Sequence, residues 1–282
     1  MSTPTQLPSI LLVGCGKMGG AMLDGWLACG LPPSAVIDRH RNSLPAPHIL
    51  VPSLDDLPAD FQPDIIILAV KPQKADATLE ILARRFARAT LLSVMAGRSI
   101  ASLSSVYTAA AEGTAPVFIR AMPNTPSTLG AGMTGLYAPP AATPEQKQQC
   151  DSLMRAVGET VWVETEQQID AVTGISGSGP AYVFLLAELL EKAGVEQGLP
   201  QATARTLARA TLYGAGQMLH SLPTDADELR RNVTSPGGTT AAALGVLMAP
   251  DAWPASTSQA GAAAVRRASA LAGYAPPPRL PP

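Results

Sequence analysis

A glycine-rich turn between an apolar run and a helical pattern constrains the fold of this chain more than any other feature. The turn is Gly14-Cys15-Gly16-Lys17-Met18-Gly19; it follows Ile10–Val13 and opens a helix predicted over Met18–Ala28. Glycines at these spacings permit a tight turn, close approach of a pyrophosphate to the backbone, and close packing of helix on strand. The N–H groups at the start of the helix can then bind phosphate oxygens. The pattern predicts a dinucleotide-binding loop.

Short apolar runs alternate with helical patterns through the first half of the chain. The further predicted strands are Val36–Ile37, Ile65–Val70, Leu91–Val94, Val117–Ile119 and Val161–Val163. Helices are predicted between several of them, over Lys74–Ala87 and Ile100–Ala111. Continuously apolar strands that alternate with helices are typical of a parallel sheet covered on both faces.

From about Asp170 onward the pattern is helical only. The predicted helices are Pro180–Lys192, Pro200–Leu222, Asp225–Asn232, Thr239–Met248 and Ser256–Leu271. We therefore expect an α/β, Rossmann-like N-terminal domain with a mostly parallel sheet over residues 1–168, followed by an all-α C-terminal domain over residues 169–274. The proline-rich segment 275–282 is predicted to be a disordered tail.

Composition excludes several classes of protein. With 20 basic and 22 acidic residues the net charge is −2, which gives no reason to expect nucleic acid or an anionic membrane as a partner. Three scattered cysteines and three scattered histidines indicate neither a disulfide framework nor a metal site. Residues 1–9 lack the basic start of a signal peptide, and the longest apolar run is too short to span a membrane. We expect a soluble, cytoplasmic protein. Charged residues make up only 15%, which favours a surface partly covered in an oligomer.

The end of the second predicted strand bears on the choice of cofactor. An acidic residue there favours NAD by accepting from a ribose 2′-OH, and an arginine favours the 2′-phosphate of NADP. Asp38, Arg39 and Arg41 supply both. Because two arginines can clamp a phosphate, we favour NADP, with NADH also accepted. A solvated charge cluster is the simpler alternative.

Ligands of open α/β sheets bind beyond the carboxyl ends of the strands, so the loops that follow the other strands are candidates. These loops are Lys71-Pro72-Gln73, Met95-Ala96-Gly97 and the segment Arg120–Pro126. Each is compact and contains proline or glycine. For any single one of them, an ordinary turn is the alternative explanation.

A second glycine cluster, Ser235-Pro236-Gly237-Gly238-Thr239-Thr240, precedes an alanine-rich helix. Consecutive uncovered N–H groups at a helix start can hold an anion. No lysine or histidine lies in the cluster, which favours a small carboxylate over a polyphosphate. A helix cap with a flexible lead-in is the alternative. A third glycine-rich segment, Gly174–Tyr182, is interpreted as a packing and hinge segment.

In combination these motifs resemble the pyrroline-5-carboxylate reductase family. The resemblance rests on the first glycine loop, Ala69–Gln73, Met122–Pro126, Ser176–Tyr182 and Val233–Thr240, which occur in family order and span most of Ile10–Ala272. It implies reduction of 1-pyrroline-5-carboxylate to L-proline by hydride transfer from NAD(P)H, the last step of proline biosynthesis. It also implies that the helical domain forms a homodimer, often built into larger rings of dimers.

The resemblance carries site residues over to this chain. It places the substrate carboxylate on Ser235, Gly237, Gly238 and Thr239, and it assigns Thr240 to the ring nitrogen as the catalytic residue. The cofactor residues that it implies are Gly14, Cys15, Gly16, Lys17, Met18, Gly19, Arg39, Ala69, Val70, Lys71, Pro72, Met95, Ala96, Gly97, Asn124 and Asn232. Lys17, Gly19 and Asp38 depart from the usual family pattern, which bears on cofactor preference.

The motifs leave three alternative functions to compare with this one. A β-hydroxyacid dehydrogenase shares the two-domain plan and the glycines 174, 177 and 179, but its catalytic lysine position holds Val183. Alcohol oxidation needs that base, which argues against this function. A reductase of another cyclic imine, and a non-catalytic dinucleotide-binding sensor, stay as alternatives. The sensor would have no need of the segment Ser235–Thr240.

Overall fold

The computed structural model describes residues 7–86, 89–111 and 116–273. The predicted tail 275–282 and most of the N-terminal segment 1–9 lie outside the described residues. The described residues form two compact units, one within 7–177 and 264–273, and the other of residues 178–263. The domain boundary predicted after residue 168 falls at the start of helix α5 (Gln168–Val172), close to the division after Gly177.

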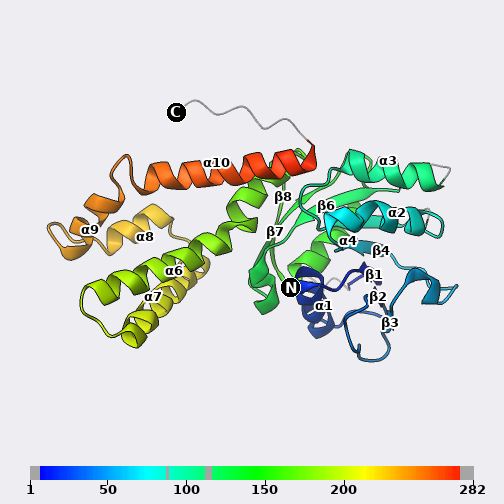
Figure 1. Ribbon diagram of the computed structural model, residues 1–282, viewed down its shortest axis with the longest axis horizontal. Coiled ribbons are helices and arrows are strands. Elements are labelled where there is room, and N and C mark those ends of the chain that lie inside the picture. The colour runs from blue at the N-terminus through cyan, green and yellow to red at the C-terminus, as the bar shows by residue number, and fades with distance from the viewer. Residues whose placement is uncertain (1–6, 87–88, 112–115, 274–282) are drawn as a thin grey trace. The chain divides into compact units, whose positions relative to one another are not determined.

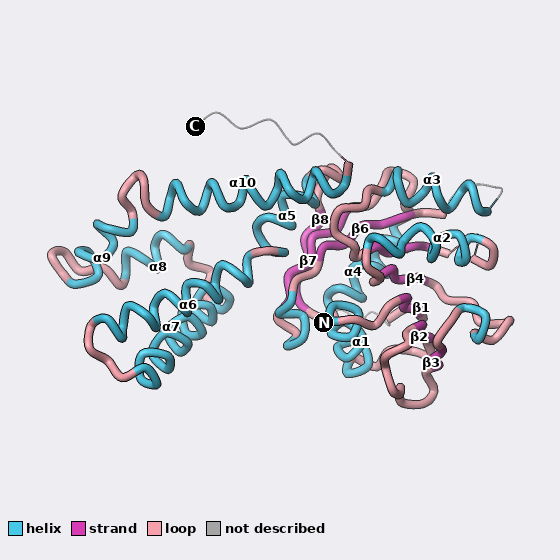
Figure 2. The backbone as a smooth tube through the Cα atoms, in the orientation of Figure 1, coloured by secondary structure: helices cyan, strands magenta, loops and turns pink. Residues whose placement is uncertain are grey.

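The first unit is built on one eight-stranded sheet (Figure 2). Its strands are β1 (Ile10–Val13), β2 (Ala35–Ile37), β3 (Ile49–Val51), β4 (Ile65–Leu68), β5 (Thr90–Ser93), β6 (Phe118–Met122), β7 (Gly132–Tyr137) and β8 (Gly158–Trp162). They lie in the order β3-β2-β1-β4-β5-β6-β7-β8, and only the β6–β7 pair is antiparallel. The expected mostly parallel, Rossmann-like sheet is confirmed. β3 and β7 are additions to the predicted strands.

Alternate residues of the central strands belong to two apolar cores, one on each face of the sheet. Ile10 and Leu12 of β1 pack with α1 (Lys17–Ala28) and α4 (Pro144–Arg155) on one face. Leu11 and Val13 pack with α2 (Ala75–Ala83) and α3 (Ile100–Ala111) on the other. Both faces of β1 and β4 are therefore buried, which explains why these strands are apolar without alternation.

The connection between β2 and β3 is the irregular part of this unit. Doubly wound folds usually place a helix between consecutive parallel strands. Here residues 38–48 form a loop without a helix. The space beyond the end of β2 is bordered by this loop, by the turn after β3 and by α2.

The second unit is helical (Figure 1). It contains α6 (Gly179–Glu196), α7 (Gln201–Ser221), α8 (Ala226–Asn232), α9 (Thr239–Leu247) and the first part of α10 (Trp253–Ala272). α6 and α7 pack through the close contact of Gly194 with Ala204 and through the Glu191–Arg205 ion pair. Among the described helices, none is long and apolar enough to cross a membrane.

Candidate functional site

The first glycine loop joins β1 to α1, and its glycines serve two purposes. Gly14 has φ +92°, and a Cβ atom there would lie 2.8 Å from the carbonyl oxygen of Ala69. A Cβ atom on Gly19 would overlap the carbonyl oxygen of Gly14. Both positions are therefore restricted to glycine by the packing of loop, strand and helix.

Gly16 differs, because a Cβ atom there would meet nothing within 4 Å. Packing does not explain this glycine. Gly16 caps α1 with no side-chain hydrogen bond, and the first turn of α1 holds no acidic residue. The N–H groups at the start of α1 have no partner within the helix, so they can bind an anionic ligand that approaches past Gly16.

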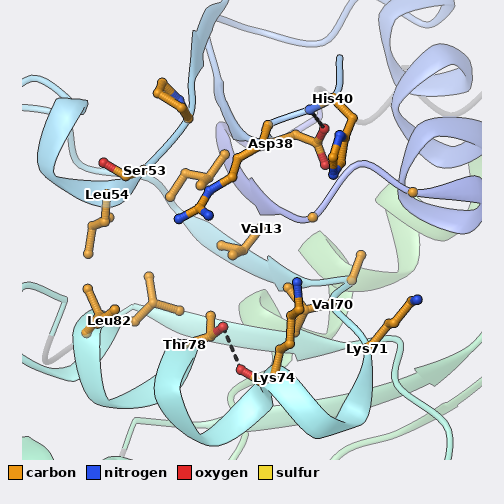
Figure 3. A pocket seen from close by; sticks show the side chains of 17 residues that line it. Val13, Asp38, His40, Ser53, Leu54, Val70, Lys71, Lys74, Thr78 and Leu82 are labelled. Carbon is orange, nitrogen blue, oxygen red and sulfur yellow. Dashed lines mark hydrogen bonds between the residues drawn. The ribbon is translucent and has the colours of Figure 1, made fainter.

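A cavity of about 530 Å³ opens beside this loop, beyond the carboxyl ends of β1, β2 and β4 (Figure 3). The chain reverses its direction of winding here, since β2 and β4 lie on opposite sides of β1. Ligands of open α/β sheets bind at such switch points. Five segments line the cavity: Val13, Gly14 and Gly16; Ile37 to His40; Pro52 to Leu54; Ala69 to Lys71; and Lys74, Thr78, Ile81 and Leu82 of the helix that begins there.

Cations are the most frequent charged groups of a lining that is otherwise largely apolar. Arg39, Lys71 and Lys74 line the cavity, and no ion pair of theirs is found within the described chain. Other arginines of this unit are paired, for example Arg98 with Asp76 and Arg120 with Glu166. Unpaired cations converging on an apolar cavity fit a ligand that is itself anionic.

Asp38 is the one carboxylate in the described lining, and both of its oxygens accept hydrogen bonds from backbone N–H groups. Its Oδ2 accepts from the N–H of Cys15 at 2.8 Å, and its Oδ1 accepts from those of His40 at 2.7 Å and Arg41 at 2.9 Å. Partial burial raises the pKa of this carboxyl, but the three N–H groups lower it further, so the net pKa lies below its usual value. Asp38 thus ties the loop after β2 to the glycine loop.

Arg41 does not line the cavity, contrary to the expectation that both arginines would clamp a phosphate. Its Nη2 lies 2.9 Å from Oδ1 of Asp24, its Nε donates to the carbonyl of Ser43, and its Nη1 contacts Sγ of Cys15 at 3.5 Å. The guanidinium is therefore occupied. Burial raises the pKa of the Cys15 thiol, although Arg41 partly offsets this effect.

The predicted residues after β5 and β6 lie outside this cavity lining. Met95 is buried, and Gly97 has φ +70° with the Cβ of Leu271 directly against it. The Asn124 amide donates to the carbonyl of Ser176 at 3.0 Å and accepts from the N–H of Met133 at 2.8 Å. Asn124 therefore has a structural role in joining the loop after β6 to two other segments.

The remaining predicted cofactor residues divide between the two units. Cys15, Lys17, Met18 and Gly19 belong to the glycine loop and the start of α1, and Pro72 directly follows the lining residue Lys71. Asn232 is the last residue of α8 in the second unit and is exposed.

The predicted substrate residues surround the start of α9 in the second unit. Gly238 is the N-cap, with no side-chain hydrogen bond, and Thr239 and Thr240 form the first turn. Gly237 has φ +68° with open space where a Cβ would project, and the N–H of Gly238 donates to the carbonyl of Ser235 at 3.0 Å. The N–H groups at the start of the nine-residue helix have no partner within it, and side-chain hydroxyls lie next to them. This arrangement can hold a small carboxylate.

Sequence reasoning missed part of the cavity wall. His40, Ser53, the α2 N-cap residue Lys74, and Thr78 and Leu82 of α2 were not among the predicted site residues. For Lys74 a signal existed, namely a cation directly after the loop Lys71-Pro72-Gln73. Thr78 and Leu82 follow the return of the chain from β3 to β4, so their position beside the end of β2 depends on the strand order and not on a local pattern.

The fold and the cavity define a dinucleotide-binding protein of the Rossmann class with an appended helical domain. Comparison with known proteins narrows this class. A family model for pyrroline-5-carboxylate reductase dimerisation matches residues 166–271, and one for coenzyme F420-dependent NADP oxidoreductases matches residues 9–97.

Individual relatives agree with these matches. The chain is 38% identical to a pyrroline-5-carboxylate reductase of Pseudomonas aeruginosa over 94% of this chain and 97% of the relative. A Haemophilus influenzae enzyme of that name is 36% identical over 84% and 88% of the two chains. A solved structure from Coxiella burnetii superposes with a TM-score of 0.83 at 34% identity, covering 94% and 98%. One from Plasmodium falciparum with NADP bound gives 0.80 at 26% identity, covering 95% and 99%.

The chain belongs to the pyrroline-5-carboxylate reductase family, whose members are NAD(P)-dependent oxidoreductases. The family resemblance and the expected two-part architecture are confirmed.

Proposed function

We propose that this chain reduces 1-pyrroline-5-carboxylate to L-proline with NADPH, the last step of proline biosynthesis. The observation that carries this proposal is the presence of two separate anion-binding elements in a member of this family. One is the cavity with its open glycine backbone and unpaired cations. The other is the uncapped start of α9, with hydroxyls but no cation beside it.

The cavity residues fit NADPH. The N–H groups at the start of α1 would hold the pyrophosphate, and Gly16 would let it approach. Ile37, Leu54 and Leu82 would bury the adenine, and Arg39 would face the 2′-phosphate. When bound, NADPH supplies the hydride that is added to the C=N carbon of the imine.

The residues at the start of α9 would hold and orient the substrate. Ser235, Gly237, Gly238 and Thr239 bind the carboxylate through N–H and hydroxyl groups, and the Thr240 hydroxyl hydrogen-bonds the ring nitrogen. Positioning of this kind accounts for much of the acceleration of hydride transfer, because the protonated imine is already electrophilic. The segment Asn232–Thr240 contains no carboxylate or imidazole, so we assign the proton of the reaction to water.

We further propose that the helical domain, residues 169–274, forms a homodimer that can assemble into larger rings, while residues 1–168 bind the dinucleotide. Large apolar side chains of α6 are exposed in the single chain, with Phe184 at 61% and Leu185 at 52%. Exposed large apolar side chains that gather on one helix fit a subunit interface. Cys15, Cys29 and Cys150 are unpaired, which supports a reducing, cytoplasmic location.

The decisive experiment measures NADPH oxidation by the purified protein with three substrates. Pyrroline-5-carboxylate should be reduced much faster than a six-membered cyclic imine carboxylate or an imine without a carboxylate. Faster reduction of either of the latter would assign the chain to another cyclic imine. Tight NADPH binding with no oxidation on any of the three would favour the non-catalytic sensor.

A further inference from the structure

The positive charges of the cavity come from two sides, and only one side belongs to the loop after β2. Arg39 lies on that loop, whereas Lys71 and Lys74 lie between β4 and α2. We propose that Lys74 is a specificity-determining residue for NADPH, whose ammonium group binds the 2′-phosphate opposite Arg39. This inference rests on the proposed use of NADPH and names a further residue that selects it.

The cavity corresponds to the adenosine half of the cofactor. The pyrophosphate would lie at the start of α1, yet of that region only Gly14 and Gly16 line the cavity. The rest of the lining comes from the ends of β1 and β2, from the loops after β2, β3 and β4, and from α2 with its N-cap residue Lys74. In this fold the ribose 2′ position faces the end of the second strand. Cations of the cavity therefore face the group that distinguishes NADPH from NADH.

Lys74 is placed to reach this group. Lys74, Thr78, Ile81 and Leu82 follow one another at helical spacing and form the cavity-facing side of α2. In Figure 3 the Lys74 side chain rises from the start of α2 toward Val70 and the interior of the cavity, whereas Lys71 points to one side. The hydroxyl of Thr78 donates to the carbonyl of Lys74 at 2.8 Å and fixes this turn.

Among the described residues, Lys74 forms no ion pair with a neighbouring carboxylate. Asp76, the acidic residue in the first turn of α2, is paired with Arg98 at 2.5 Å. Asp38 across the cavity is occupied by three backbone N–H groups. The start of α2 adds the positive end of a helix dipole to the ammonium group.

Other polar groups of the lining are less suitable as phosphate donors. The Ser53 hydroxyl donates its proton to Oδ2 of Asp56 at 2.6 Å, so that proton is not directed at a ligand. Because Asp38 serves as a structural link, its presence does not mark the site for the 2′-OH of NADH. Arg39, Lys74 and His40 are left as the donors for a 2′-phosphate.

The test compares 2′,5′-ADP with 5′-AMP, which differ only in the 2′-phosphate, by isothermal titration calorimetry. Lys74→Met should weaken 2′,5′-ADP roughly 10- to 100-fold, since a hydrogen bond between charged groups is lost. Binding of 5′-AMP should change by less than about twofold, because the adenine contacts remain. Lys74→Arg should restore most of the affinity. Lys147→Met on α4, outside the cavity lining, is the control for the loss of one positive charge.

Two results would overturn the assignment of Lys74: unchanged binding of 2′,5′-ADP, or equal weakening of both nucleotides in Lys74→Met. Steady-state assays separate this inference from the proposed function. In Lys74→Met the KM for NADPH should rise by a larger factor than the KM for NADH. If Lys74→Met weakens 2′,5′-ADP selectively but the wild-type protein fails to reduce pyrroline-5-carboxylate, the proposed activity is wrong and the assignment of Lys74 stands.

Discussion

The Ser269 hydroxyl donates a hydrogen bond of 2.7 Å to Oδ2 of Asp170, joining the end of α10 to α5, and each residue is 2% exposed. The other oxygen of Asp170 is buried without a partner among the described residues. Ser269→Ala would leave the whole carboxyl unsatisfied, which costs about 1–3 kcal/mol of stability. Urea denaturation should show this loss, and Ser258→Ala at an exposed position of α10 should show almost none. Equal stability of the two variants would contradict the role of this pair.

The contact of Gly97 with Leu271 gives a second prediction. Gly97 has φ +70°, and a Cβ there would lie 2.6 Å from the Cβ of Leu271. Gly130 has nearly the same φ, +68°, with nothing within 4 Å of a Cβ. Gly130→Ala therefore costs backbone strain alone, whereas Gly97→Ala adds overpacking of about 1–3 kcal/mol. The unfolding free energies of the two variants measure the difference directly. Identical values would show that α10 moves to accommodate the added methyl group at no cost in stability.

The two arginines after β2 should differ in their effect on cofactor choice. Arg39 lines the cavity, whereas Arg41 is held by Asp24. Arg39→Ala should raise the KM for NADPH about tenfold more than that for NADH, because a contact with a charged group is lost. Arg41→Ala should change the two values by the same factor. Steady-state kinetics with both cofactors tests this, and parallel changes in Arg39→Ala would exclude Arg39 as a phosphate ligand.

Asp38 gives a pH-dependent prediction. Its folded pKa is below the ordinary value of 3.8, so its contribution to stability is present above that value and is lost as the pH falls through the folded pKa. Asp38→Asn keeps the shape but cannot accept on both sides. The variant should be less stable near neutral pH, and the difference should shrink below about pH 4. Urea titrations at several pH values measure it, with exposed Asp55→Asn as the control. A difference independent of pH would refute the mechanism.

The same variant tests what the acidic residue does for the cofactor. If Asp38 only holds the glycine loop, Asp38→Asn should weaken NADPH and NADH binding by similar factors. A selective loss of NADH binding would mean that Asp38 contacts the ribose.

The sequence was sufficient to predict those elements whose residue types are determined by local structure and burial. The run Ile10–Val13 and the glycines after it predicted β1, the turn and α1, because burial on both faces and a tight turn restrict the residue types directly. Helices α6 to α10 were predicted from their helical patterns, for example from Pro180 in the first turn of α6. β7 was missed because Gly132 and Gly135 interrupt its pattern. A Cβ on Gly135 would lie 2.6 Å from Val172, so that glycine reflects packing against α5, a distant segment.

Within the candidate site, the roles of several residues depend on tertiary contacts that the sequence does not reveal. Asp38, Arg39 and Arg41 lie within four consecutive residues, and nothing in their order tells which side chain faces a ligand. The partners that decide it, Asp24 and the N–H of Cys15, belong to other segments. Asn124 is a similar case, since its amide is occupied by Ser176 and Met133.

The last prediction concerns Thr240, in the first turn of α9 behind the N-cap Gly238. Thr240→Val keeps the shape of the side chain and removes the hydroxyl. If that hydroxyl orients the ring nitrogen, the variant loses a hydrogen bond to a charged group, worth about 1.5–3 kcal/mol. The kcat/KM for pyrroline-5-carboxylate should then fall roughly 10- to 150-fold.

The KM for NADPH should change little in Thr240→Val, because the cofactor is assigned to the cavity beside the first glycine loop. Thr257→Val on α10 removes a hydroxyl at an exposed position of the same unit and serves as the control. A kcat/KM for Thr240→Val within about twofold of the wild type, well below the expected loss, would remove Thr240 from the mechanism. A fall of equal size in both variants would instead point to the helical unit as a whole, because only a contact specific to Thr240 separates them.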